Sequence, residues 1–268
     1  MRAVKDDFAR KYGPWALVTG ASSGIGAEFA RQLAARGLSL VLAARRKERL
    51  DALAESLTRD HGVEVRVVSI DLARRDFLPA IEAAAQGVEI GLLVNNAGFG
   101  AKGRFLDSDL DQQLEMLDVN CRASLVLAHA FGRKMAARHR GGIIFTSSTA
   151  AFQGTPFTSH YAATKGWGLQ LAEGLACELR SDGIDVLALC PGATDTEGPR
   201  RTGVDPARVP VKMMATTPVV AAALKGLGKK AIVIPGAINR LAYAAVRLTP
   251  RSFAAEAAGR LIRRSTGG

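Results

Sequence analysis

The segment WALVTGASSGIG, residues 15–26, decides the fold of this chain. A short apolar run from Ala16 to Thr19 ends in a glycine-rich turn, and a stretch with helical periodicity follows. Glycines let the backbone approach a pyrophosphate, whose charge is stabilised by the free N–H groups and the dipole of the next helix. The segment therefore predicts a dinucleotide-binding turn. Its spacing, G-x-x-x-G-x-G, differs from the general G-x-G-x-x-G fingerprint, so a purely structural turn is the alternative.

Outward from this unit, strand-like and helical segments alternate along the chain. The predicted strands cover residues 16–19, 38–43, 63–70, 92–95, 142–146, 186–190 and 231–234. The predicted helices include residues 26–36, 47–61, 77–85, 110–138 and 161–181. Apolar strands separated by helices indicate a parallel sheet that is covered on both faces. We expect one α/β domain over residues 1–268, a Rossmann-like doubly wound parallel sheet of about seven strands with its ligand beyond the strands' carboxyl ends.

Two later segments depart from this alternation. Residues 195–217 contain prolines and glycines and little periodicity, which is typical of a binding loop, so they are the candidate substrate lid. Residues 240–264 are rich in Ala and Leu, carry Arg at helical intervals and are interrupted at Thr249-Pro250. They predict one or two amphipathic helices, which lie on their own domain, on another subunit or on an anionic membrane.

The charge of the chain is concentrated in its last quarter. The 268 residues include 36 Lys and Arg against 25 Asp and Glu, and the formal net charge of +11 arises entirely after Pro199. Such an excess suits an anionic membrane, an acidic carrier or nucleic acid, with a solvated basic face as the alternative. No motif typical of a nucleic-acid-binding protein occurs, so we expect no such partner.

Composition excludes several other classes. The chain is 48% hydrophobic and 23% charged, as in ordinary globular proteins, and no apolar run approaches the roughly 18 residues that span a bilayer. Three cysteines without CxxC spacing predict buried thiols in a reducing compartment, with no disulfide framework. The four histidines show no metal-ligand spacing, so no metal site is expected. The amino terminus lacks an apolar signal region, which favours the cytoplasm.

Five motifs follow one another in a recognisable order: TGASSGIG at residues 19–26, NNAG at 95–98, Ser148, Tyr161-x-x-x-Lys165, and Pro191-Gly192. Their order and intervals resemble those of the short-chain dehydrogenase/reductase family over about residues 14–240. The region after Pro191 is also similar to a branch of bacterial reductases labelled DltE-like. The resemblance implies an oxidoreductase that uses a nicotinamide cofactor.

The resemblance assigns catalytic roles to four residues. Tyr161 would protonate a carbonyl oxygen, or take the proton in the reverse direction, although the ordinary tyrosine pKa of about 10 is too high for this near neutral pH. Lys165, one helical turn on, would favour the tyrosinate and bind the nicotinamide ribose. Ser148 would donate a hydrogen bond to the carbonyl oxygen, with Ser147 as the structural alternative. Asn120 would hold a water that links the lysine to solvent, unless it only caps the core.

The second predicted strand indicates which nicotinamide cofactor is preferred. Ala44 stands where a carboxylate would bind the ribose 2′-hydroxyl of NAD, and Arg45 follows it. A guanidinium there would bind a 2′-phosphate, so NADP(H) is favoured over NAD(H). Arg46 and Lys47 are either further phosphate ligands or solvated residues of the next helix, and Asn95 serves either the cofactor or the sheet. The residues predicted to bind the cofactor are Gly20, Ser22, Ser23, Gly24, Ile25, Gly26, Arg45, Asp71, Leu72, Asn95, Ala97, Gly98, Asn120, Tyr161, Lys165, Pro191, Gly192, Thr194 and Thr196.

The substrate is predicted only by class. We expect a small-molecule carbonyl or secondary alcohol with an apolar body, of the ketone or 3-oxoacyl type. Five residues would line an apolar pocket or simply pack in the core: Phe99, Phe152, Phe157, Met213 and Met214. Relatives are usually homo-oligomers, so a dimer or tetramer is expected. The alternative function is a non-catalytic NADP-binding sensor or scaffold, peripheral to a membrane through its basic tail.

Overall fold

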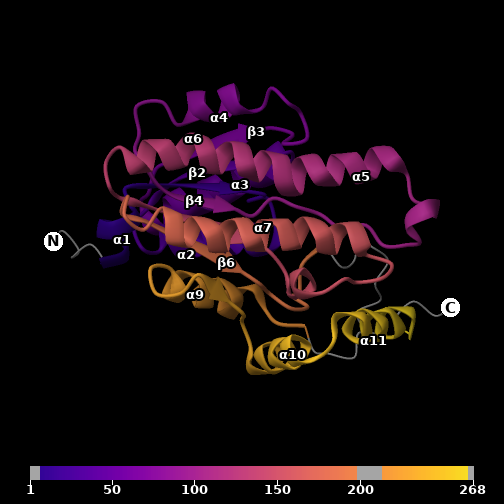
Figure 1. The fold of residues 1–268 in the computed structure, drawn as a ribbon. Helices are drawn as coiled ribbons and strands as arrows, with labels where there is room; N and C mark the ends of the chain where they lie inside the picture. Colours follow the sequence, from indigo (N-terminus) through magenta and orange to yellow (C-terminus); the bar gives the residue numbers. More distant parts are fainter. Residues whose placement is uncertain (1–6, 198–212, 265–268) are drawn as a thin grey trace.

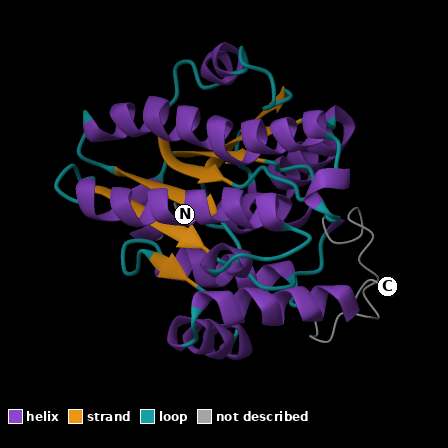
Figure 2. Ribbon diagram, turned by 45° about the vertical axis from the view of Figure 1, so that its right-hand side comes forward, coloured by secondary structure: helices purple, strands orange, loops and turns teal. Residues whose placement is uncertain are grey.

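The protein is described by a computed structural model over residues 7–197 and 213–264. Seven strands form one parallel sheet in the order β3-β2-β1-β4-β5-β6-β7 (Figures 1 and 2). Their bounds are β1 (Trp15–Thr19), β2 (Ser39–Ala44), β3 (Val65–Ser69), β4 (Ile90–Asn95), β5 (Gly141–Thr146), β6 (Ile184–Leu189) and β7 (Ile232–Val233). The predicted Rossmann-like α/β fold is confirmed. The strand order reverses between β1 and β4, where doubly wound sheets bind ligands.

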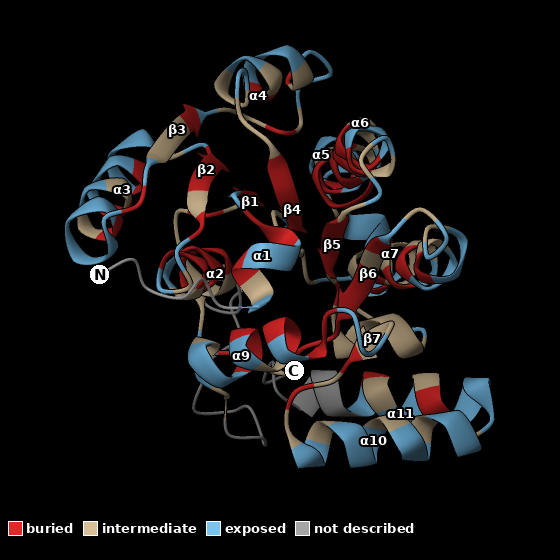
Figure 3. Cartoon of the chain, turned by 90° about the vertical axis from the view of Figure 1, so that its left-hand side faces the viewer, coloured by how far each residue is buried: buried red, intermediate tan, exposed pale blue. Residues whose placement is uncertain are grey.

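Helices cover both faces of the sheet. The described helices before β5 are α1 (Asp7–Tyr12), α2 (Gly24–Ala34), α3 (Lys47–His61), α4 (Leu78–Ala84), η1 (Phe105–Asp107), α5 (Leu110–Leu117), η2 (Asp118–Ala123) and α6 (Ser124–Ala136). After it come η3 (Thr149–Phe152), α7 (Ser159–Glu178), α9 (Thr216–Gly226), α10 (Ala237–Leu248) and α11 (Arg251–Arg264). Phe29 of α2 and Val219 of α9 pack in one core layer, and Phe131 of α6 and Leu169 of α7 pack in the other. Strands β1, β2, β4, β5 and β6 are buried along nearly their whole length, whereas β3, at one edge of the sheet, is mostly half-buried (Figure 3).

The predicted helix over residues 110–138 is interrupted. The chain forms α5, then a widened π-helical turn, η2, and then α6. Such turns insert an extra residue into the helical ladder and often occur at functional positions. Here the widened turn carries Asn120.

After β6, the structure contains one helix that the sequence did not predict, and it confirms the helical tail. Most of the predicted lid, residues 198–212, lies outside the described residues, and its predicted end overlaps α9, a helix that the periodicity did not reveal. The basic tail forms two helices, α10 and α11, separated at Thr249-Pro250 as predicted. Within the described residues, no helix is both long and apolar enough to cross a membrane.

The prediction of three buried cysteines is wrong for one of them. Cys121 and Cys190 are buried, but Cys177 is exposed near the carboxyl end of α7. Cys177 lies on the same helical stripe as Gln170, on the side of α7 that faces away from the sheet. An apolar residue on an exposed helix face carries no sequence signal of its own.

Candidate active site

The glycine-rich turn connects β1 to α2 through two left-handed glycines. Gly20 and Gly24 have φ values of 66° and 56°, which side chains other than glycine rarely adopt. A Cβ at Gly26 would overlap the carbonyl oxygen of Gly20 and lie 2.5 Å from Nδ2 of Asn96. The turn therefore keeps bare backbone at the amino end of α2, where a pyrophosphate can approach N–H groups.

The turn is tied to the segment after β4 by Thr19. Its hydroxyl accepts hydrogen bonds from the backbone N–H groups of Asn96 and Ala97, each at 3.0 Å, and donates one to the Val94 carbonyl at 3.2 Å. The Asn96 amide returns a bond of 2.9 Å to the Thr19 carbonyl. These bonds hold the predicted residues Ala97 and Gly98 beside the turn, at the reversal of strand order.

Tyr161 and Lys165 lie one turn apart on α7 and face the carboxyl end of the sheet. The Tyr161 ring lies against Gly100, where an added Cβ would be 3.0 Å from the ring. Lys165 is 8% exposed, donates a hydrogen bond of 2.9 Å to the Thr146 carbonyl at the end of β5, and has its Nζ 5.8 Å from the Tyr161 ring centroid. The two side chains therefore occupy one site.

Ser148 and Ser147 have different surroundings. The Ser148 hydroxyl caps η3 by accepting the Ala150 N–H at 3.1 Å, and it also forms a hydrogen bond with Tyr161. Ser147 is buried and its hydroxyl donates to the Lys165 carbonyl at 2.7 Å, which anchors α7 to β5. Ser148 is therefore the serine with a hydroxyl in the site, and Ser147 supports the helix.

Asn120 joins three parts of the site. Its side-chain oxygen accepts the Phe99 N–H at 3.1 Å, and its amide donates to the Phe99 carbonyl and to the Thr164 hydroxyl, each at 2.9 Å. A Cβ at Gly98 would lie 2.8 Å from Oδ1 of Asn120 and 3.0 Å from Nζ of Lys165. Asn120 thus fixes the loop after β4 and lies beside the same glycine as the Lys165 amine.

Burial shifts the pKa values of both titrating groups of the site, Tyr161 and Lys165. It raises the pKa of Tyr161, and the hydrogen bond with Ser148 opposes this rise in part. Burial lowers the pKa of Lys165 from its usual value to about 8, because the charged amine is removed from water. At neutral pH the site therefore holds a protonated phenol and a mostly charged amine, a proton donor beside a cation.

The two adjacent arginines after β2 contact different parts of the protein. Arg45 forms an ion pair of 3.0 Å with Glu115 of α5, whereas Arg46 reaches the glycine-rich turn, with its Nη2 2.9 Å from the Ser22 hydroxyl and 2.8 Å from that of Ser23. The sequence offered Arg46 only as an alternative. No local signal distinguishes the two adjacent arginines.

Three other residues predicted for the adenosine end of the cofactor make contacts within the protein. Leu72 is 5% exposed and packs in the core. The Asp71 carboxylate accepts the Ala73 N–H at 3.0 Å, which stabilises the turn after β3. Asn95 is buried and donates 3.1 Å to the Ser124 carbonyl of α6, so its side chain joins β4 to that helix, the alternative left open by the sequence.

At the other end of the site, the segment after β6 lies close to the glycine-rich turn. Thr194 donates 3.0 Å to the Gly192 carbonyl, and Pro191 accepts the Thr149 N–H at 3.0 Å. The methyl group of Thr196 would lie 3.0 Å from a Cβ at Gly24. The two predicted cofactor segments therefore face each other across the amino end of α2.

Asn239 of α10 is a neighbour of this segment that the sequence did not indicate. A Cβ at Gly192 would lie 2.5 Å from its Oδ1, and its amide donates 2.8 Å to the Pro235 carbonyl and 3.5 Å to the sulfur of Met214. Met214 thus packs against the start of α10, while Phe152 stacks on Tyr243 with ring centroids 4.2 Å apart. Helix α10 therefore contacts Phe152 and Met214, two of the residues that the sequence predicts for the substrate pocket.

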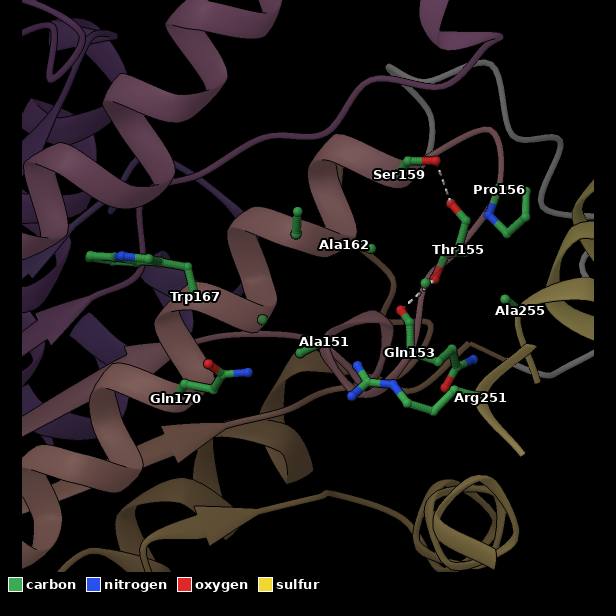
Figure 4. A pocket seen from close by; sticks show the side chains of 13 residues that line it. Ala151, Gln153, Thr155, Pro156, Ser159, Ala162, Trp167, Gln170, Arg251 and Ala255 are labelled. Atoms are coloured by element: carbon green, nitrogen blue, oxygen red, sulfur yellow. Dashed lines mark hydrogen bonds between the residues drawn. The ribbon is translucent and has the colours of Figure 1, made fainter. Parts of the chain in front are cut away.

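A separate cavity of about 530 Å³ lies on the far side of α7. Ser159 and Gln170 of α7 line it on one side, and Arg251 and Ala255 of α11 line it on the other (Figure 4). These α7 residues follow a stripe about half a helical turn away from Tyr161 and Lys165. The cavity is therefore distinct from the site that contains the tyrosine and the lysine.

Comparison with known proteins agrees with this geometry. A family model described as short chain dehydrogenase matches residues 14–205. The chain is 32% identical over 237 residues to 7beta-hydroxysteroid dehydrogenase of Collinsella aerofaciens, covering 87% of this chain and 90% of that protein. It is 37% identical over 184 residues to very-long-chain 3-oxoacyl-CoA reductase of Anas platyrhynchos, covering 67% of this chain and 59% of that protein.

A solved structure is similar over most of the chain. The short-chain dehydrogenase from Sphingobium yanoikuyae in complex with NADPH superimposes with a TM-score of 0.79 and 36% identity, covering 88% of this chain and 94% of that one. None of these similarities addresses the DltE-like branch, which stays a prediction.

Proposed function

The chain belongs to the short-chain dehydrogenase/reductase family and is an oxidoreductase, and from this premise we propose that it is an NADP(H)-dependent carbonyl reductase or alcohol dehydrogenase. Its substrate would be a ketone or 3-oxoacyl compound, or the matching secondary alcohol, with an apolar body. The observation that carries the proposal is the placement of Ser148, Tyr161 and Lys165 in one site beside the glycine-rich turn.

The chain's own residues fit a dinucleotide. Gly20, Gly24 and Gly26 leave a cradle that a Cβ would fill, and Arg46 stands beside it. The bound nicotinamide would supply or accept the hydride. Thr194 and Thr196 would hold its end of the cofactor, and Lys165 would bind the adjoining ribose.

Proton transfer falls to the side chains. Tyr161 would give its proton to the carbonyl oxygen while Ser148 donates a hydrogen bond to the same oxygen, so that the developing negative charge is stabilised twice. The Lys165 ammonium would lower the cost of forming the tyrosinate. Asn120, which lies beside Gly98 with Lys165, would hold the water that returns a proton from solvent.

The preference for NADP(H) is supported by charge. Two arginines follow β2, no acidic residue ends that strand, and one similar structure is an NADPH complex. The apolar substrate is supported by the similarity to a hydroxysteroid dehydrogenase and a 3-oxoacyl-CoA reductase. The cytoplasmic location stays a prediction.

Tyr161→Phe tests the enzymatic proposal directly. The variant should lose roughly 10²- to 10⁴-fold in kcat for ketone reduction, because the proton donor is gone, whereas its affinity for NADPH should change far less, because the loss of one hydroxyl leaves the other predicted cofactor ligands in place. Calorimetric titration with NADPH measures the affinity, and NADPH oxidation with a bulky ketone measures the rate. Retained NADPH binding in a wild-type protein that turns over no carbonyl would instead support the sensor or scaffold.

The same titration tests the cofactor preference. Wild-type protein should bind NADPH more tightly than NADH, and Arg45→Ala should weaken NADPH much more than NADH if the residue predicted from the sequence binds the phosphate. Equal losses for the two cofactors would transfer that role to Arg46, which the geometry places at the turn.

A further inference from the structure

The guanidinium of Arg46 forms hydrogen bonds with three side chains. Its Nε and Nη2 lie 3.2 and 2.9 Å from the Ser22 hydroxyl, and Nη2 lies 2.8 Å from the Ser23 hydroxyl. Its Nη1 donates to the Glu197 carboxylate at 2.7 Å. Of these partners, the two hydroxyls are neutral and can rotate, whereas Glu197 brings a negative charge.

Glu197 reaches this position from the segment after β6. Its second carboxylate oxygen pairs with Arg49, in the first turn of α3, and the preceding residue Thr196 lies against Gly24 of the turn. The carboxylate is thus held by two arginines next to the cradle for the cofactor. These arginines hold the pKa of Glu197 at about 2, so the group is charged throughout the range in which the protein would be studied.

We propose that Glu197 is a specificity-determining residue whose carboxylate takes the place of a 2′-phosphate on Arg46 and so reduces the selection of NADP(H) over NAD(H). A phosphate and a carboxylate both seek charge-assisted hydrogen bonds from a guanidinium and repel each other when they share one. A cofactor with a 2′-phosphate must displace Glu197 or bind beside its charge. A cofactor with a neutral 2′-hydroxyl is repelled less by the carboxylate.

This inference rests on the proposed use of a nicotinamide cofactor, and the variant Glu197→Gln tests it. Glutamine keeps the length of the side chain and removes its charge. Titration at one low salt concentration should show NADPH binding about fivefold more tightly than to wild type, with NADH changed by less than about twofold. The gain should shrink at high salt, which screens partly exposed charges.

Three controls separate this effect from a general change in charge, from contacts with the nicotinamide and from a change in stability. Glu55→Gln, on an exposed part of α3 farther from the turn, removes the same charge and should leave both affinities unchanged. Titration with 2′,5′-ADP, which has the 2′-phosphate but no nicotinamide, should show the same gain for Glu197→Gln as NADPH does. An unchanged melting temperature would confirm that the variant is folded.

The titrations distinguish a failure of the inference about Glu197 from a failure of the proposed preference for NADP(H). If wild type prefers NADPH and Glu197→Gln leaves that affinity unchanged or weaker, the role of Glu197 is refuted and the preference stands. If wild type shows no preference but Glu197→Gln creates one, the preference fails and the role of Glu197 stands. If neither protein distinguishes the cofactors, both are wrong.

Discussion

At the scale of single residues, burial and a few hydrogen bonds decide the chemistry. Lys165 is an amine enclosed by protein, with its Nζ bonded to the Thr146 carbonyl. Its lowered pKa places its titration near the upper end of the physiological range, whereas Tyr161 keeps its proton to higher pH because burial raises its pKa. The amine, and not the phenol, should therefore set the alkaline limit of activity.

We expect kcat/KM for carbonyl reduction to fall above about pH 8. The sign follows from the lowered pKa: Lys165 is charged below that pH and loses its proton above it, and the support it gives the tyrosinate is lost with the charge. The buried thiols nearby, Cys121 and Cys190, have pKa values raised to about 11 and about 12 and stay neutral through this range.

A pH profile of the wild-type protein checks this expectation. Lys102→Gln is the matched control, because burial also lowers the pKa of Lys102, and that variant should keep the alkaline fall. A profile that stays level well above this pH would show that the Lys165 charge is not required.

At the scale of elements, the shape of the glycine-rich turn depends on close contact between the backbone of the turn and the first turn of α2. Gly26, in the first turn of α2, contacts the Gly20 carbonyl, while Gly174 of α7 has open space where its Cβ would be. Close packing therefore explains the glycine at position 26. The structure shows no reason for the glycine at position 174.

Alanine substitutions separate the two cases. Gly26→Ala should lower the free energy of unfolding by about 1–3 kcal/mol through overpacking and should weaken NADPH binding. Gly174→Ala should raise it by about 0.5–1 kcal/mol, because alanine suits the interior of a helix better, and should leave binding unchanged. Thermal unfolding and calorimetry measure both effects, and an undisturbed Gly26→Ala protein would contradict the close contact.

At the scale of the whole molecule, exposed apolar side chains suggest where the expected contact between subunits would lie. Leu110, Leu114 and Leu117 of α5 are 67%, 50% and 44% exposed and lie on one stripe of the helix. Monomeric proteins rarely leave such patches open. The stripe makes α5 the expected contact between subunits in the homo-oligomer that the sequence analysis predicts.

Leu114→Glu should convert the oligomer to monomers, because it places a charge in the middle of this stripe. Light scattering after gel filtration measures the mass. Ala52→Glu, at an exposed position of α3 away from the exposed apolar residues of α5 and α10, is the control and should leave the mass unchanged. A wild-type protein that is already monomeric would refute the proposal for α5.

The sequence alone determined the architecture and the class of chemistry. Strands, helices and the glycine-rich turn arise from short-range rules: apolar periodicity, and backbone freedom at Gly20 and Gly24. Ser148, Tyr161 and Lys165 are among the five motifs that carried the family resemblance, and the structure brings all three together. The amphipathic character of the tail was equally visible, because its arginines repeat at helical spacing, although the sequence left open whether it forms one helix or two.

Only the tertiary structure decided which of two similar neighbours does which task. Arg45 and Arg46 look alike in the chain, but consecutive side chains at the end of a strand point in different directions, so one meets Glu115 and the other the turn. Ser147 and Ser148 separate in the same way. Glu197 reaches Arg46 across 151 residues of chain, and a contact of that range depends on how the sheet and loops pack, which local patterns do not encode.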